Sequence, residues 1–126
     1  MVEGQRFTFK KEERVTGKKR IENLFAHGRS FVAYPFRIVF YEYEPCTPSS
    51  VSILVSIPKK KLKKATDRNR MKRLAREAYR LNKNLFEKNS RLDIAFIYLK
   101  DELSGYDVVE KGVCKALREI SNKIEE

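Results

Sequence analysis

The sequence is poor in the residues from which most catalytic sites are built. It contains one histidine, His27, and no tryptophan. Acid–base catalysis without a metal needs a paired base and acid, and two-metal catalysis needs clustered carboxylates. Asp67 stands beside Arg68 at a predicted helix start, and Asp93 stands alone in an apolar segment, which favours a structural hydrogen bond. No glycine-rich phosphate loop is present. We therefore predict no catalytic residue and no metal site in this chain.

Further absences bear on the compartment. The two cysteines, Cys46 and Cys114, lack the C-x-x-C spacing, and a single histidine cannot complete a zinc site with them. They are expected to be ordinary thiols in a reducing cytosol. No apolar run approaches the ~18 residues of a membrane span, and the N-terminus has no signal-peptide core. The sequence therefore predicts a soluble, cytoplasmic protein that does not enter a membrane.

Positive charge is abundant and concentrated. The 126 residues include 28 Lys and Arg against 17 Asp and Glu, a formal net charge of +11. Residues 59–80 hold eleven of the cations and two carboxylates, Asp67 and Glu77, so this stretch carries most of the net charge. A balance of this kind indicates an anionic partner.

The same stretch is predicted to be an amphipathic helix. Met71, Leu74, Ala75, Ala78 and Leu85 recur at helical spacing and form an apolar stripe. The opposite face is almost purely cationic and consists of Arg68, Asn69, Lys72, Arg73, Arg76, Arg80 and Lys83. Like charges four residues apart repel one another unless an anion compensates them. We therefore expect a polyanion, most commonly nucleic acid, on this face. Thr66 or Asp67 is expected to cap the helix start.

Residues 64–80, KATDRNRMKRLAREAYR, resemble a known family. An Arg-Asn-Arg motif that opens a basic helix, in the pattern K-A-x-x-R-N-R-x-K-R-L-x-R-E-A-[YF]-R, is the hallmark of the protein subunit of bacterial ribonuclease P. The resemblance extends from about residue 14 to residue 120. It implies that a catalytic RNA performs Mg²⁺-dependent cleavage of precursor tRNA. The protein would then bind no cofactor itself, act as a monomer in the holoenzyme, and hold the 5′ leader of the precursor.

The rest of the chain predicts an α+β fold. Apolar patterning indicates a helix at 18–26 that Gly28 ends and Thr16 caps, strands at 30–34, 36–43, 51–57 and 92–99, and a last helix that Ser104 caps. The order α-β-β-β-α-β-α fits one domain over residues 1–126, an α-β sandwich preceded by a mobile basic arm at 1–14. The resemblance adds an unusual left-handed β-α-β crossover around the basic helix.

Two sets of site residues follow. The helix face is expected to bind the catalytic RNA through Arg68, Asn69, Arg70, Lys72, Arg73, Arg76 and Arg80. A leader cleft is expected to be formed by Phe25, Ile21, Tyr34, Phe36, Lys59, Lys60 and Lys61. The family places an aromatic pair on the first helix, and Ile21 stands here at the first of those positions. From the residues alone, core packing is the favoured role of Phe25, and only the resemblance assigns it to the cleft.

Two other functions share parts of this pattern. A basic ribosomal RNA-binding protein would have the same charge and α+β architecture, but its RNA partner would cleave nothing. A helix-turn-helix DNA-binding module would need a second helix directly before the basic one, where this sequence has an apolar β-branched segment and Pro58.

Overall fold

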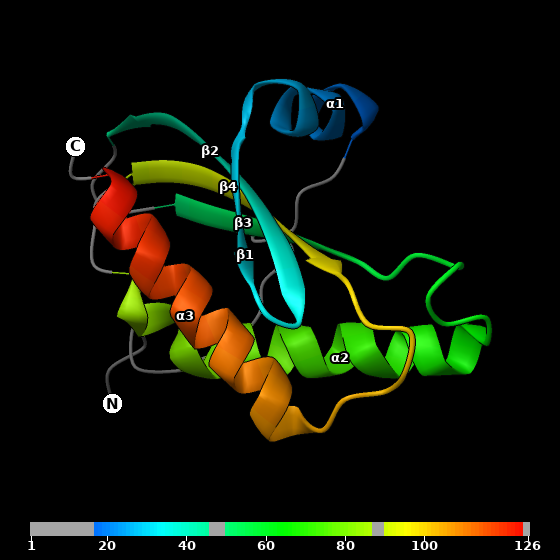
Figure 1. Cartoon of the computed structure of the whole chain (residues 1–126). Coiled ribbons are helices and arrows are strands. Elements are labelled where there is room, and N and C mark those ends of the chain that lie inside the picture. The colour runs from blue at the N-terminus through cyan, green and yellow to red at the C-terminus, as the bar shows by residue number, and fades with distance from the viewer. Residues whose placement is uncertain (1–16, 46–49, 87–89, 125–126) are drawn as a thin grey trace, which may run out of the picture.

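The chain forms one four-stranded sheet with helices on both of its faces (Figure 1). The structure, a computed structural model, describes residues 17–45, 50–86 and 90–124. The elements are α1 (Lys18–His27), β1 (Arg29–Ala33), β2 (Phe36–Pro45), β3 (Ser50–Ser56), α2 (Ala65–Asn82), the 3₁₀ turn η3 (Lys83–Leu85), β4 (Ser90–Tyr98) and α3 (Tyr106–Ile124). This confirms the predicted α+β class and element order. The predicted arm at 1–14 and the Thr16 cap lie outside the described residues.

The strands lie in the order β1-β2-β4-β3. β1 and β2 form an antiparallel hairpin, and β2 continues antiparallel to β4. β3 pairs with β4 in parallel, so β3, α2 and β4 make the β-α-β crossover that the resemblance implies. Its left-handed sense stays a prediction. Since β3 directly precedes α2, a helix-turn-helix arrangement is excluded.

Alternation along the strands gives the sheet two different faces. On one face, Ile38 of β2 and Ile94 and Phe96 of β4 belong to the main core with Met71 of α2 and Val113 of α3. We call this the core face. On the other face, Val39 and Ala95 pack only with Leu24 of α1 and partly buried neighbours. We call this the α1 face. The core face is closed by two long helices, whereas α1 is a ten-residue helix and covers less of its face.

Two predicted helix boundaries had different outcomes. Gly28 does end α1, because its N–H donates to the Leu24 carbonyl at 2.8 Å. A Cβ at this position would lie 2.5 Å from that oxygen, so only glycine fits. The predicted cap of α2 was wrong. The N-cap is Lys64, and no side chain caps the helix. Asp67 lies in the first turn, where its charge interacts favourably with the helix dipole. Among the described helices, none is long and apolar enough to cross a membrane.

Candidate nucleic-acid interface

The cationic face of α2 lies opposite its packed face. Met71, Ala75, Ala78 and Tyr79 are buried against the core. On the other side, Asn69, Arg70 and Arg73 are exposed, while Lys72, Arg76 and Arg80 are partly exposed. Helical spacing therefore separated the two faces correctly. Within the described residues, Arg70 and Arg73 make no hydrogen bond or ion pair, and both border a surface hollow of about 490 Å³ with Leu74 and Glu77.

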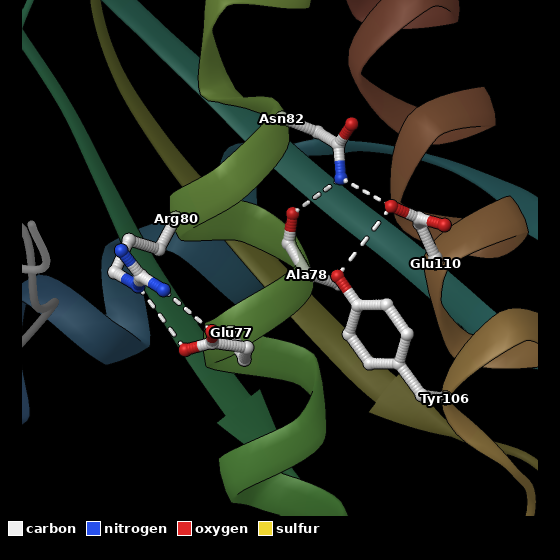
Figure 2. A network of polar contacts seen from close by, with 6 residues as sticks. All are labelled: Glu77, Ala78, Arg80, Asn82, Tyr106 and Glu110. Carbon is white, nitrogen blue, oxygen red and sulfur yellow. Dashed lines mark hydrogen bonds and ion pairs between the residues drawn. The ribbon is translucent and has the colours of Figure 1, made fainter. Parts of the chain in front are cut away.

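Contacts with α3 hold the C-terminal half of α2 in place (Figure 2). Asn82 Nδ2 donates to the Ala78 carbonyl at 2.9 Å and to Glu110 Oε2 of α3 at 3.1 Å. The Tyr106 hydroxyl donates to the same carboxylate oxygen at 3.4 Å. Since α2 also packs on the core from Met71 to Tyr79, its cations are presented from a fixed backbone rather than from a flexible loop.

One carboxylate lies among the cations of α2. Arg80 donates to Glu77 through Nε at 3.1 Å and through Nη2 at 2.5 Å (Figure 2). Hydrogen bonding to Arg80 lowers the pKa of Glu77, so this side chain keeps its negative charge at pH 7. The predicted RNA-contact residue Arg80 therefore has an internal partner. Sequence spacing at i and i+3 could have indicated this pair.

Arg68, the first arginine of the motif, makes contacts that the sequence did not predict. Its Nη1 donates to the backbone carbonyls of Leu62 at 2.9 Å and Lys63 at 2.8 Å. The side chain is partly buried and closes the preceding loop against the start of α2. Part of its guanidinium is thus used for structure, and only the remainder can face a phosphate.

The basic loop at 58–64 is well fixed by these contacts. The N–H groups of Lys61 and Leu62 both donate to the Pro58 carbonyl, at 3.0 and 3.2 Å, and the Leu62 side chain is buried in the core. Lys59, Lys60 and Lys61 are exposed, as a backbone-binding role requires. The sequence did not predict that Asp67, Asp101 and Glu102 lie beside this loop, around a hollow of about 480 Å³.

Phe25 is a surface side chain. It is 45% exposed, which excludes the interpretation of a core residue. Ile21, one turn earlier on the same flank of α1, is partly buried. The part of the α1 face that remains open includes exposed Val32 and Arg37, which are paired across β1 and β2. Arg37 was missed as a candidate, although strand alternation had placed it opposite Phe36.

The two other aromatic residues predicted for the leader cleft, Tyr34 and Phe36, lie in different environments. Tyr34 is 58% exposed at the β1–β2 turn, and Lys100 Nζ lies 5.8 Å from its ring centroid. Phe36 is 0% exposed on the core face, where its ring lies edge-on to Phe96 at 5.7 Å. The prediction that Phe36 lines the leader cleft was therefore wrong, because a base cannot reach it.

Asp93 makes the structural hydrogen bonds that its isolation predicted. It is fully buried on the α1 face, and it accepts from Arg20 and from the Tyr43 hydroxyl. Among the described residues, no group of three or more His, Cys, Asp or Glu side chains could hold a metal ion.

Comparisons with known proteins agree with this architecture. A family model described as Ribonuclease P matches residues 9–124. The ribonuclease P protein component of Porphyromonas gingivalis is 38% identical over 123 residues, which cover 94% of this chain and 90% of that protein. The corresponding component of Petrotoga mobilis is 35% identical over 126 residues, covering 94% and 98%.

A solved structure shows the same fold. The RNase P protein from Thermotoga maritima superposes with a TM-score of 0.69 at 25% identity, over 85% of this chain and 96% of that one. The match of the family model extends over nearly the whole chain, and curated relatives match it at similar length. The chain therefore belongs to the ribonuclease P protein family.

Proposed function

We propose that this protein binds the catalytic RNA of ribonuclease P through the cationic face of α2 and the 5′ leader of precursor tRNA through the open α1 face. The observation that carries the proposal is the arrangement of α2, in which one side is buried in the core and the other presents Arg70 and Arg73 to solvent. Family membership supports a ribonuclease P RNA as partner and a role in an endoribonuclease complex. We propose one protein per RNA.

Binding to the catalytic RNA would be mainly electrostatic. Lys and Arg side chains that neutralise phosphates release counterions, so the affinity falls steeply as salt rises. The fixed backbone of α2 supports this role, because its cations need not be ordered on binding. Asn69, exposed between the arginines, can both donate and accept hydrogen bonds.

Leader binding would use stacking and backbone contacts. Phe25 offers an exposed ring at the edge of the α1 face, and Lys59, Lys60 and Lys61 offer charges for the leader phosphates. Stacking on an aromatic ring contributes about 1–3 kcal/mol per base and depends little on sequence. A subunit that handles many different precursors needs this tolerance.

The chemistry of cleavage would lie in the RNA. The chain has one histidine, and the buried Asp93 is already hydrogen-bonded to Arg20 and Tyr43. These observations support a protein that binds and positions RNA while Mg²⁺ held by the ribonucleoprotein drives hydrolysis. The protein alone is then expected to cleave no precursor.

The test is reconstitution with ribonuclease P RNA. We expect the protein to raise precursor cleavage at low Mg²⁺ and to bind precursor tRNA more tightly than mature tRNA. Phe25→Ala should reduce that preference about tenfold while assembly with the RNA is unchanged. Phe25→Tyr is the matched control, because it keeps an aromatic ring at the same position and should retain the preference. Equal weakening of both tRNA forms by Phe25→Ala would contradict the proposed leader site.

A further inference from the structure

One small apolar cluster and one ion pair hold α1 on the sheet. Of its side chains, only Leu24 is buried, in a small cluster with Val39 and Ala95. Its second anchor is an ion pair with a residue 73 positions away. Arg20 Nε donates to Asp93 Oδ2 at 2.9 Å, and Arg20 Nη2 donates to Asp93 Oδ1 at 2.5 Å. This is the bidentate geometry in which arginine fixes orientation as well as distance.

The sheet provides a prepared partner for this arginine. Asp93 is 0% exposed, and the Tyr43 hydroxyl donates to its Oδ2 at 2.7 Å. Tyr43 is itself packed by Tyr41, edge-on at 4.9 Å, and by the Arg91 guanidinium, 4.7 Å from its ring centroid. A buried carboxylate that loses its cation is strongly destabilised. Displacing α1 would leave the buried Asp93 carboxylate without its cation, so this carboxylate favours the docked position of α1.

The pair also fixes how α1 is rotated. On the helical wheel, Arg20 and Phe25 lie on opposite flanks of Leu24. With Arg20 tied to Asp93 on one flank, the ring of Phe25 is directed to the other side of α1. A single hydrophobic contact at Leu24 would leave this rotation poorly defined, because hydrophobic burial is non-directional.

We infer that Arg20, Asp93 and Tyr43 form a polar latch that positions α1, so that Phe25 is presented for the 5′ leader. These three are positioning residues, since none of them needs to contact RNA. The inference deepens the proposed function and rests on it for the leader. The docking of α1 by the latch can be tested without any RNA.

The first experiment measures amide hydrogen exchange in the free protein. An isolated ten-residue helix is marginal in water, so protection of residues 21–28 depends on docking. Arg20→Lys keeps the charge but cannot make the bidentate contact, and we expect exchange in residues 21–28 to become on the order of tenfold faster. Exchange in α2 should not change. Lys19→Met, an exposed neighbour on the same helix, should leave α1 protected.

The second experiment measures the ratio of mature tRNA to precursor tRNA dissociation constants in the holoenzyme. We expect Arg20→Lys to reduce this preference about tenfold, as loss of the stacking at Phe25 would, with unchanged binding to the catalytic RNA. Tyr43→Phe, which removes one hydrogen bond and keeps the ring, should show the same effect more weakly. It also tests the latch if the Arg20 variant fails to fold.

The outcomes separate the two proposals. If Phe25→Ala lowers the precursor preference and Arg20→Lys does not, the latch is overturned and the leader site stands. If Arg20→Met and Lys19→Met reduce the preference equally, Arg20 acts by charge alone and the latch is again overturned. If Phe25→Ala leaves the preference unchanged, the proposed leader site fails, and hydrogen exchange alone then decides whether the latch holds α1.

Discussion

Glu77 is expected to oppose RNA binding, and its replacement should strengthen it. The carboxylate lies among the arginines of α2 and occupies two donors of Arg80, at 2.5 and 3.1 Å. Glu77→Gln keeps the size and helix propensity of the side chain and removes the charge. The side chains of Arg80 and Glu77 are 31% and 47% exposed, so their pair contributes little to the free energy of unfolding. The substitution should therefore change binding without changing stability.

The magnitude follows from one charge. A carboxylate ~4 Å from a phosphate in water repels it by about 1 kcal/mol, so its removal should lower the dissociation constant for ribonuclease P RNA about fivefold. The positive charge of Arg80 is then no longer offset by Glu77, which should steepen the slope of log K against log salt by about 0.9. Arg80 lowers the pKa of Glu77, so in the wild-type protein Glu77 should stay charged as pH falls through the ordinary carboxyl range. The wild type should therefore continue to bind RNA more weakly than Glu77→Gln over that range.

The assay is filter binding to the RNA at several salt concentrations, with urea unfolding measured in parallel. Glu119→Gln makes the same change on a different helix, α3, and serves as the matched control. If Glu77→Gln instead weakens binding or flattens the salt slope, the carboxylate orders Arg80 for its phosphate. The view that the pair competes with RNA would then be refuted.

Three further predictions concern other parts of the structure. Arg68→Lys cannot span both loop carbonyls, so hydrogen exchange at residues 61–62 should accelerate; unchanged exchange would contradict the structural role of Arg68. Gly28→Ala places a Cβ against the Leu24 carbonyl, so urea unfolding should show a loss of about 1–3 kcal/mol, and wild-type stability would contradict that contact. Burial raises the pKa of Cys114, so its alkylation in a Cys46→Ser variant should be slow at pH 7 and accelerate only at more alkaline pH than for a free thiol.

The local pattern of apolar and polar residues was sufficient to predict the order of helices and strands and to distinguish the two faces of α2. The helical period separated Met71 and Ala75 from Arg70 and Arg73 without any tertiary information. Alternation in β2 likewise set Phe36 apart from Arg37. It could not say which set faces the two long helices, because period-2 patterning defines two sides and assigns neither to the core. The incorrect assignment of Phe36 to the leader cleft follows from that ambiguity.

Contacts between segments that are distant in the chain could not be predicted from sequence patterns. Arg20 and Asp93 are 73 residues apart, and only the packing of α1 over β4 brings them together. Arg68 was placed correctly on α2, but its bonds to the carbonyls of Leu62 and Lys63 depend on the path of the basic loop. The sequence could show that Asp93 needed a hydrogen-bond partner, and the fold was required to show which one.

These contacts show that the net charge of +11 does not give the number of cations available for RNA. Arg20 neutralises a buried carboxylate, Arg68 holds a loop, and Arg80 is paired with Glu77. Counterion release counts phosphates neutralised rather than cations present. A count of basic residues therefore overstates the salt dependence of RNA binding, whereas Arg70 and Arg73 can each contribute in full. The same residue type thus serves two purposes in this protein. Arginines with carboxylate or carbonyl partners stabilise the structure of the surface, and we propose that Arg70 and Arg73 bind the RNA.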